Sequence, residues 1–521
     1  MRTRRSSLSA MRRVAVAAGS ELAAAGGATA ADAGGNAVDA ALAAVLVSMC
    51  TEPGIIAPGA SGFISVWPAD GAPVVIDAYA EMPGRGLPPE RFGEGGHPVE
   101  MAYGGGMSTI VGWGSVATPG AFAGFDLACR RFGALSWSEL LAPSIAATRD
   151  GFPVSGASAE YLDYAHEAIF GWDPASSAVV HRADGSPVQL GDVITMPELA
   201  STLEHLAAVG SSDMYRGSLA ERTAAAALEA DGILTAEDLA AYEPIVREPV
   251  IVEEDGWSIA TNPAPAVGGV AMAAMLLLLR DPPFEGWTAA GSRRAAATQR
   301  AVLRYRRNAL DDYEKRGAAA ARLLDLAEAG DLPALLRSPS TVHVSAVDSE
   351  GTACSVTVSA GYGAGAMVPG TQMWMNNSLG ELELARDGFH TLQPGTRLVS
   401  NMAPTVARRP DGSVLAVGSP GADRITTALS IVLVNFLHLG MSLRDAIAHP
   451  RMHIETFGGI PTIAFEPGLP VEPFDDMSVR RFPDLSMYFG GVAAAVWDPV
   501  AGLFAAADPR RSGGTARGGI A

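Results

Sequence analysis

The residues of greatest chemical interest lie where a run of alternating, β-branched residues begins. The segment Ser340-Thr341-Val342-His343 opens a run of alternating β-branched residues, which predicts a strand. A threonine hydroxyl is a weak nucleophile unless a base removes its proton. If Thr341 were the first residue of a chain, its own α-amine, with an ordinary pKa of about 7.7–8.0, would be that base. This chemistry requires cleavage of the Ser340–Thr341 bond, and the alternative is a threonine that merely opens a strand.

A glycine-rich turn is the second chemical feature. Residues 418–422 read Gly-Ser-Pro-Gly-Ala and precede a predicted helix over 423–438. Such a turn aims backbone N–H groups at developing negative charge, although a plain helix cap is the alternative. The glycine-rich run 361–365 also follows a strand, but Pro369-Gly370 comes soon after it and no helix opens. A dinucleotide site is therefore not predicted.

The sequence predicts neither a metal nor a cofactor. His343 has no second histidine at ligand spacing nearby, and Cys50, Cys129 and Cys354 stand singly in apolar stretches. We interpret these thiols as core residues rather than as a disulfide framework. The single lysine, Lys315, lies in a polar run, so Schiff-base chemistry is not favoured.

The elements that must position these residues predict an α+β layered fold. Helical and paired-strand patterns follow one another along the chain. The predicted strands are 14–17, 62–67, 73–79, 246–253, 257–261, 342–347, 352–359, 372–375, 402–408, 413–417, 462–465, 491–497 and 502–507. The predicted helices are 20–33, 37–49, 121–132, 137–150, 197–208, 218–230, 267–280, 288–313, 423–438 and 442–448. The glycine- and arginine-rich end, 512–521, is predicted to be frayed.

Composition excludes some classes of protein. The chain has 521 residues and a net charge of −19, which does not suit binding to nucleic acid. The strongest apolar run, 276–279, is too short to span a membrane. The basic, alanine-rich start imitates a signal peptide, but Ser20, Glu21 and several glycines make it only weakly hydrophobic. We therefore predict a cytoplasmic protein with no nucleic-acid or membrane partner.

A series of short motifs in a fixed order resembles the gamma-glutamyltranspeptidase family of N-terminal nucleophile hydrolases. The resemblance covers about residues 14–511, and the shared order is stronger than any one motif. The motifs are Gly34-Gly35-Asn36-Ala37-Val38-Asp39, Ser115-Val116-Ala117-Thr118-Pro119-Gly120, Leu140-Leu141-Ala142-Pro143, Gly151-Phe152-Pro153-Val154, Thr341-Val342-His343, Asn376-Asn377, Met402-Ala403-Pro404-Thr405, Gly418-Ser419-Pro420-Gly421, Pro450-Arg451-Met452-His453 and Asp508-Pro509-Arg510.

The resemblance implies a four-layer αββα sandwich that cleaves itself before Thr341. A large subunit, 1–340, and a small subunit, 341–521, would form a heterodimer, and any higher assembly is left open. Ser359 would hydrogen-bond the nucleophile, the amides of Gly421 and Ala422 would form the oxyanion hole, and His343 would orient the processing site. The implied reaction is cleavage of a γ-glutamyl-like amide in a small molecule, with transfer to water or to an amino acid.

The substrate-binding positions depart from the family pattern. Tyr79 stands where the family has an arginine that binds the glutamyl carboxylate, and Arg85 is near but out of register. The other changes are Gly361 for Asn, Ser378 for Gln or Glu, Glu381 for Asp, and Ser400-Asn401 for a Ser-Ser pair, with a shortened stretch before Ser400. A tyrosine cannot form a bidentate charged pair with a carboxylate. We therefore expect the acyl chemistry to be intact and glutathione not to be the natural substrate.

Two other functions remain open from the sequence. Relatives that resemble this family hydrolyse a C–C bond in natural-product pathways, including those to 4-alkylprolines, and the replaced anchors would suit that reaction. A non-catalytic scaffold that binds a small ligand is the alternative of another class.

Overall fold

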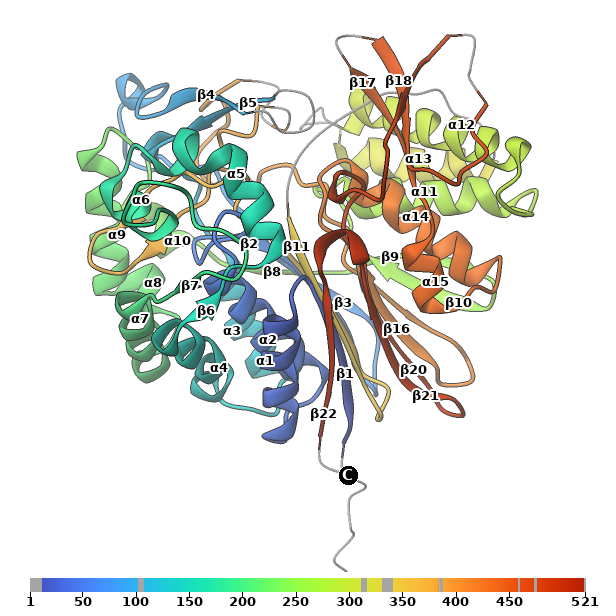
Figure 1. The fold of residues 1–521 in the computed structure, drawn as a ribbon, viewed down its shortest axis with the longest axis horizontal. Helices are drawn as coiled ribbons and strands as arrows, with labels where there is room; N and C mark the ends of the chain where they lie inside the picture. The colour runs from blue at the N-terminus through green and yellow to red at the C-terminus, as the bar shows by residue number, and fades with distance from the viewer. Residues whose placement is uncertain are drawn as a thin grey trace, which may run out of the picture.

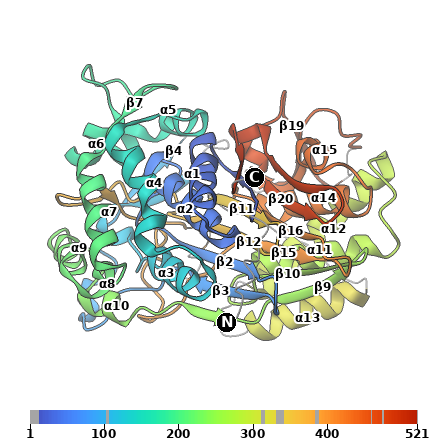
Figure 2. The same cartoon turned by 90° about the horizontal axis from the view of Figure 1, so that it is seen from below.

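Two facing β-sheets between helical layers form the core of the protein (Figures 1 and 2). The computed structural model describes residues 12–101, 107–310, 316–329, 341–382, 384, 388–457, 460–472 and 476–519. Contacts of β11 with β16 and β20, and of β12 with β15 and β16, join the two sheets face to face. The predicted α+β class and αββα layering are confirmed.

Each sheet takes strands from both sides of residue 341. The seven-stranded sheet has the order β22 (Gly514–Gly518), β1 (Val14–Ala18), β11 (Val342–Asp348), β12 (Ala353–Ser359), β2 (Ser61–Trp67), β3 (Val74–Ala78) and β8 (Ile245–Arg247). The six-stranded sheet has the order β21 (Gly502–Ala507), β20 (Ala493–Asp498), β16 (Val414–Gly418), β15 (Thr405–Arg408), β10 (Trp257–Thr261) and β9 (Val250–Glu254). The large and small segments are thus interleaved and do not form separate domains.

Alanine-rich helices cover the seven-stranded sheet. They are α1 (Glu21–Asp32), α2 (Ala37–Thr51) and α3 (Ala121–Phe132), with α4 (Trp137–Asp150) and α7 (Pro197–Val209) packed further out (Figure 2). Every residue of α2 is buried, which explains why its sequence shows no polar face. Asn36 and Asp39 form a capping box at its start. Small residues let α1 and α2 approach closely, because a Cβ on Gly27 would lie 2.7 Å from the Ala40 carbonyl oxygen.

A second group of helices covers the six-stranded sheet. It comprises α11 (Gly268–Arg280), α12 (Ala289–Tyr305), α13 (Arg316–Ala329), α14 (Arg424–Leu437) and α15 (Leu443–Ala448). The helix predicted over 288–313 ends earlier than expected, because a π-helical turn, Arg306–Leu310, follows Tyr305. Residues 311–313 of that prediction lie outside the described residues. The turn brings Arg306 into the interior, where it is 1% exposed.

Two sequence predictions about strands were wrong. The strand predicted over 246–253 is two strands, β8 and β9, which belong to different sheets. Pro249 separates them, because proline has no N–H for a ladder hydrogen bond. The end predicted to be frayed contains β22, which pairs with β1 from Ala18↔Gly514 to Val14↔Gly518. It therefore forms the edge of the seven-stranded sheet.

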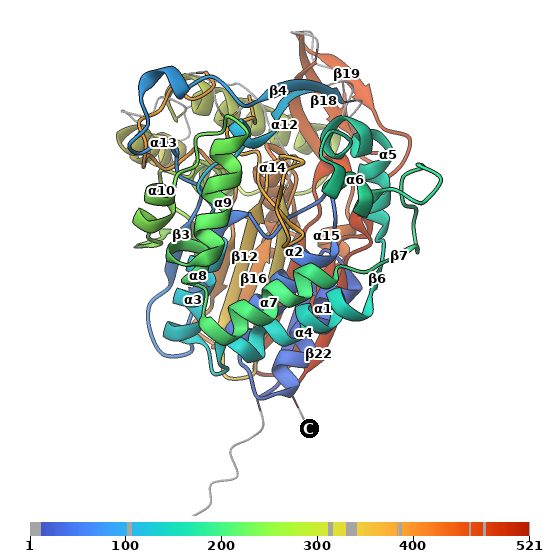
Figure 3. The ribbon, with the colours of Figure 1, turned by 90° about the vertical axis from the view of Figure 1, so that its left-hand side faces the viewer.

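The remaining elements surround this core. They are α5 (Gly156–Phe170), α6 (Pro174–Val180), α8 (Asp213–Arg216), α9 (Ser218–Glu229), α10 (Ala236–Ala241), β4 (His97–Met101), β5 (Met107–Val111), β6 (Phe152–Pro153), β7 (Val193–Ile194), β13 (Met367–Val368), β14 (Met373–Trp374), β17 (Met452–Phe457), β18 (Ile460–Phe465) and β19 (Ser478–Arg481). Figure 3 shows α4, α7 and α9 on the outer helical face. Among the described helices, none has the length and apolar character needed to cross a bilayer.

Candidate active site

Four residues from four neighbouring strands form a row across the seven-stranded sheet. Val342 of β11 pairs with Val358 of β12, so one step further in this register places Thr341 opposite Ser359. Ser359 pairs with Ser61 of β2, and the β2–β3 register then places Tyr79 beside Ser61. Adjacent strands lie about 4.8 Å apart. The predicted nucleophile, its predicted hydroxyl partner and the predicted carboxylate-binding position therefore lie in one line.

The side chains of this row face the six-stranded sheet. Alternate residues of β11 point to the same side, so Thr341 shares its face with His343 and Ser345. The Ser345 hydroxyl donates to the Ala493 carbonyl oxygen of β20 over 3.1 Å. Thr341 and Ser359 are each only 3% exposed, and the Ser359 Oγ accepts a 3.0 Å hydrogen bond from the Gly361 N–H. The candidate nucleophile is therefore enclosed between the two sheets.

His343 is a neutral spacer between the sheets. Its Nε2 lies 2.7 Å from the Ser345 Oγ, and its Nδ1 lies 2.8 Å from the Thr357 Oγ1. Since the Ser345 hydroxyl proton goes to Ala493, Nε2 must donate to Ser345 and Nδ1 must accept from Thr357. Burial lowers the pKa of His343 to about 3. The ring therefore stays uncharged near neutral pH, and its predicted role in processing stays a prediction.

His343 also relates the position of Thr341 to that of the glycine-rich turn. A Cβ on Gly418, the last residue of β16, would lie 2.3 Å from the His343 Cε1. The missing side chain of Gly418 thus makes room for the imidazole ring. Thr341 lies two residues before His343, and the turn begins just after Gly418. Thr341 and the turn are therefore at the same end of the sandwich.

The turn itself has an unusual backbone. Gly421 has φ +120°, and Ala422 has φ +65°, which is a left-handed conformation that costs a non-glycine residue about 1–2 kcal/mol. Their carbonyl oxygens accept from Arg424 N (3.0 Å) and Ile425 N (3.1 Å) at the start of α14. The N–H groups of Gly421 and Ala422 make no hydrogen bond to any described residue. Two backbone donors at a helix N-terminus are thus available for an oxyanion.

A buried network of charged residues holds the segment around Gly490, against which the turn packs. A Cβ on Gly421 would lie 2.7 Å from the Gly490 Cα, so only glycine fits there. The neighbours of Gly490 are held by Arg451, which donates to the Phe489 carbonyl oxygen (3.0 Å), and by Asp508, which accepts from Val492 N (2.8 Å). Arg451 and Asp508 form an ion pair of 2.6 Å with both side chains 1% exposed.

Arg510 extends this network. It donates to Glu466 through Nε (2.7 Å) and contacts Asp508 at 3.1 Å. Burial works to raise the pKa of Asp508, but Arg451 and Arg510 outweigh it and hold that pKa below its usual value. The motifs at 450–453 and 508–510 marked the family resemblance, but the sequence did not show that their charges meet.

Tyr79 is buried and uncharged. Its ring stacks on Phe63 with centroids 5.5 Å apart. Burial is the main reason that the pKa of Tyr79 is raised well above its usual value; the nearby Glu381 adds to the effect, and a hydrogen bond with Ser400 opposes it. The structure thus brings together three predicted substrate-binding residues, Tyr79, Glu381 and Ser400.

Arg85 does not replace the missing arginine. It contacts Asp238 at 3.2 Å and Glu81 at 3.3 Å. The nearby Arg397 is also engaged, since it donates to the Tyr79 carbonyl oxygen (2.6 Å) and lies 3.5 Å from Glu81. Both guanidinium groups are therefore committed to protein carboxylates beside the row.

Gly361 is required where it stands. It has φ +62°, and a Cβ would lie 2.2 Å from the Asn377 Oδ1 and 3.1 Å from the Glu381 carboxylate. The asparagine that the family has at this position has no room here. The Asn377 amide uses its capacity within the protein, accepting from Tyr362 N (2.7 Å) and donating to the Ile110 carbonyl oxygen (3.0 Å).

Asn376 fixes the same segment. Its amide donates to the Gly59 carbonyl oxygen (2.8 Å) and accepts from Ser378 N (3.0 Å). Ser378 is 4% exposed, and its Oγ makes no hydrogen bond to a described residue. Asn401 is also buried, and it donates to Asp423 over 3.1 Å. Ser340, the other side of the predicted cleavage site, lies outside the described residues.

Sequence reasoning missed Arg306 and Glu466, and it did not show how Asp423 or the motif residues Arg451 and Asp508 are paired. Arg306, Asp423, Arg451, Glu466 and Asp508 are all buried charges that pair across long stretches of chain. Apolar periodicity carries no signal for such pairs. A charged residue beside an otherwise apolar stretch, such as Asp423 before an apolar helix, is the hint for a pair that no motif marks.

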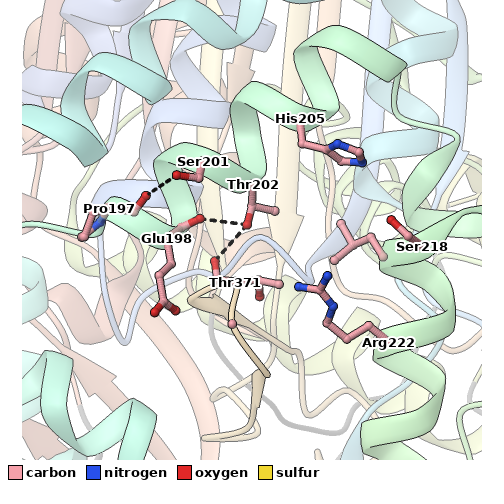
Figure 4. Close-up of a pocket in the computed structure, with 10 residues that line it drawn as sticks. Pro197, Glu198, Ser201, Thr202, His205, Ser218, Arg222 and Thr371 are labelled. Carbon is pink, nitrogen blue, oxygen red and sulfur yellow. Dashed lines mark hydrogen bonds between the residues drawn. The ribbon is translucent and has the colours of Figure 1, made fainter.

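A separate surface pocket of about 390 Å³ lies between α7, α9 and the turn at Gly370-Thr371 (Figure 4). The His205 Nε2 lies 3.1 Å from the Asp213 carboxylate, and the Thr202 hydroxyl donates to the Glu198 carbonyl oxygen over 2.8 Å. None of the sequence-predicted site residues lines it, and it holds no nucleophile–base pair. Within the described ranges, no three His, Cys, Asp or Glu side chains gather as they would around a metal ion.

Comparison with known proteins gives a consistent result. A family model described as Gamma-glutamyltranspeptidase matches residues 23–518. A glutathione hydrolase proenzyme of Pseudomonas aeruginosa is 30% identical over 473 residues, covering 84% of this chain and 82% of the relative. An Acylase ACY 1 proenzyme of Pseudomonas sp. (strain V22) is 29% identical over 526 residues, covering 93% and 91%. The crystal structure of a cephalosporin acylase from Bacillus halodurans superposes with a TM-score of 0.78 at 23% identity, covering 97% and 96%.

Proposed function

The chain belongs to the gamma-glutamyltranspeptidase family of N-terminal nucleophile hydrolases and transferases, and on that premise we propose that Thr341 is its self-generated nucleophile. Members of this family act on amide bonds and are processed into a large and a small subunit. The observation that carries the proposal is the placement of Thr341. It lies opposite Ser359, at the end of the sandwich where the N–H groups of Gly421 and Ala422 are available.

Maturation would proceed through an ester. The Thr341 Oγ1 attacks the Ser340 carbonyl carbon, the Ser340–Thr341 C–N bond breaks, and the acyl group moves to oxygen while the nitrogen becomes a free amine. Water then hydrolyses the ester and leaves a carboxylate on Ser340 and a hydroxyl on Thr341. The new α-amine, with an ordinary pKa near 8, has the basicity that the next reaction needs.

Catalysis would use the same groups a second time. The α-amine takes the hydroxyl proton as the Thr341 Oγ1 attacks the substrate amide carbon. The N–H groups of Gly421 and Ala422 stabilise the oxyanion of the tetrahedral intermediate, a contribution of about 3–4 kcal/mol for one such donor in other hydrolases. The leaving amine carries the proton away, and water or an amino acid accepts the acyl group from Thr341.

The replaced anchors support a substrate other than glutathione. Tyr79 supplies one uncharged hydrogen bond in place of a charged pair, and Gly361 leaves no side chain in place of an asparagine amide. Losing a charged, hydrogen-bonded anchor costs a few kcal/mol of recognition. A second candidate reaction, favoured by the same replacements, is C–C bond hydrolysis in a natural-product pathway with Thr341 attacking a ketone-like carbonyl. A cytoplasmic location stays a prediction.

An intact mass spectrum of the purified protein, with N-terminal sequencing, tests the nucleophile. We expect two fragments, the smaller beginning Thr341-Val342-His343. A single chain of full mass, 53.6 kDa, would contradict self-cleavage and favour a non-catalytic binding role. Assays of the processed protein with amide and ketone substrates then separate the two candidate reactions.

A further inference from the structure

A buried ion pair links the two segments of the chain beside the oxyanion turn. Arg306, in the π-helical turn after α12, pairs with Asp423, which lies directly before α14 and one residue after Ala422. Their side chains are 1% and 0% exposed. The Asn401 Nδ2 donates to the Asp423 Oδ1 over 3.1 Å. The chain of contacts thus runs from the large segment to a predicted substrate-binding position of the small one.

This pair sets which way the Asn401 amide faces. A carboxylate paired with an arginine is ionised, and an ionised carboxylate only accepts hydrogen bonds. The NH₂ group of Asn401 must therefore face Asp423, which turns the Oδ1 the other way. The charge of Asp423 fixes this orientation, because the amide oxygen of Asn401 cannot donate to a carboxylate. The Asn401 Oδ1 is buried and makes no hydrogen bond to a described residue.

We propose that Arg306 and Asp423 are positioning residues that hold Asn401 as a hydrogen-bond acceptor, and that the substrate presents an N–H or O–H donor at this position instead of a carboxylate. The inference rests on the proposed function, because Asn401 is a binding residue only if this is the acyl site. A serine hydroxyl, as in the Ser-Ser pair of the family, both donates and accepts. The amide oxygen of Asn401 only accepts, and an ionised carboxylate also only accepts, so the two could not form a hydrogen bond.

The surrounding charges favour the same kind of substrate. Glu381 lies close enough to Tyr79 to raise its pKa, so the Tyr79 side of the position carries negative charge, whereas Asp423 behind Asn401 is paired with Arg306. Arg85 and Arg397 are engaged by Asp238, Glu81 and Asp77. A second negative charge from a substrate would be repelled here. The fitting ligands are acyl groups whose α-substituent is a carboxamide, an amine or an alcohol.

Two ligands that differ in one group test the preference. L-Isoglutamine carries a carboxamide where L-glutamate carries the α-carboxylate. We expect processed protein to bind L-isoglutamine at least about tenfold more tightly by isothermal titration calorimetry, the effect of one satisfied hydrogen bond. Tighter binding of L-glutamate, or binding of neither compound, would overturn the inference. Binding needs no turnover, so a failure of the proposed reaction appears separately, as an uncleaved chain or as no amide hydrolysis.

Variants separate a positioning role from a structural one. Asn401→Ser restores a hydroxyl that can donate, and it should reduce the isoglutamine preference about tenfold. Single substitutions of Arg306 or Asp423 leave one buried charge without its partner and destabilise the protein, whereas replacing both by apolar residues is tolerated in other proteins. The double variant Arg306→Met, Asp423→Leu should fold and lose the preference. The ratio of the two affinities does not depend on the amount of folded protein, so a double variant with the wild-type ratio would refute the positioning role.

Discussion

The predicted nucleophile end and the predicted substrate-binding positions lie in one row of strands, yet they depart from the family pattern to different degrees. The predicted nucleophile end keeps Thr341, Ser359 and Gly421, and although Ala422 replaces a second glycine of the family, the donors proposed there are backbone N–H groups that the fold itself places. The binding positions use side-chain groups, and there Tyr79 and Gly361 differ from the family. Chemistry that depends on backbone geometry tolerates sequence drift nearby, whereas recognition that depends on single side chains can be replaced one residue at a time.

Removing the proposed nucleophile should give the largest effect. Thr341→Ala has no hydroxyl to attack the Ser340 carbonyl, so we expect one full-length chain on a denaturing gel. Any amide hydrolysis should fall at least about a thousandfold, as when other enzymes lose their nucleophile. Thr341→Ser keeps a hydroxyl and is the matched control, which should still be cleaved. Cleavage of the alanine variant before residue 341 would refute the assignment.

The oxyanion turn should come next. Gly421→Ala adds a methyl group 2.7 Å from the Gly490 Cα at a position with φ +120°, so the turn must shift. We expect kcat to fall about 100- to 1000-fold with a smaller change in KM, measured by steady-state kinetics. Ala422→Gly keeps the N–H and removes a methyl from a left-handed residue, so it should retain catalysis. An equal loss in both variants would show that the backbone donors are not the reason.

The buried, uncharged His343 should make the free energy of unfolding depend on pH. The pKa of His343 is 6.5 when unfolded and about 3 when folded, so the unfolded chain binds a proton that the folded protein excludes between these values. The stability present above pH 6.5 is therefore lost as pH falls, by about 1.4 kcal/mol per pH unit. In urea unfolding at pH 6.5 and pH 5, wild type should lose about 2 kcal/mol more than His343→Gln. Equal losses would show that His343 becomes protonated in the folded state.

A substitution in the binding positions should have the smallest effect and should spare processing. Tyr79→Phe removes one neutral hydrogen bond and keeps the ring stacked on Phe63. With any substrate that the processed protein turns over, we expect kcat/KM to fall about fivefold, the value of one such bond. The fraction of chains cleaved, measured by intact mass, should equal that of wild type. A lower cleaved fraction would show that the two regions are coupled.

Local pattern predicted the elements better than it predicted the contacts between them. The helices at Ala121–Phe132 and Trp137–Asp150 have the predicted bounds, and the strand pair around the nucleophile was also found. Apolar periodicity and caps determine such segments directly. The edge strand β22 was missed because its glycines and arginines resemble a loose end, and its pairing with β1 joins opposite ends of the chain.

The site was predicted as positions but not as a network. Alternation placed Thr341 and Ser359 on neighbouring strands, and the register confirmed that they are opposite each other. The pairs Arg306–Asp423 and Arg451–Asp508 join residues that are far apart in sequence. Their partners follow from tertiary packing, which no single-sequence pattern encodes. The reason for Gly361 was likewise invisible, because it depends on where the Asn377 side chain lies.

The interleaving of strands changes what unfolding would mean after cleavage. In the seven-stranded sheet, β1 from the large segment lies between β22 and β11 from the small one. Before the cut, folding is a first-order event within one molecule. After it, recovery of the same sheet requires two molecules to meet, so refolding becomes second order and the melting temperature rises with protein concentration. The stability of the cut protein would thus depend on its own concentration, as that of a dimer does.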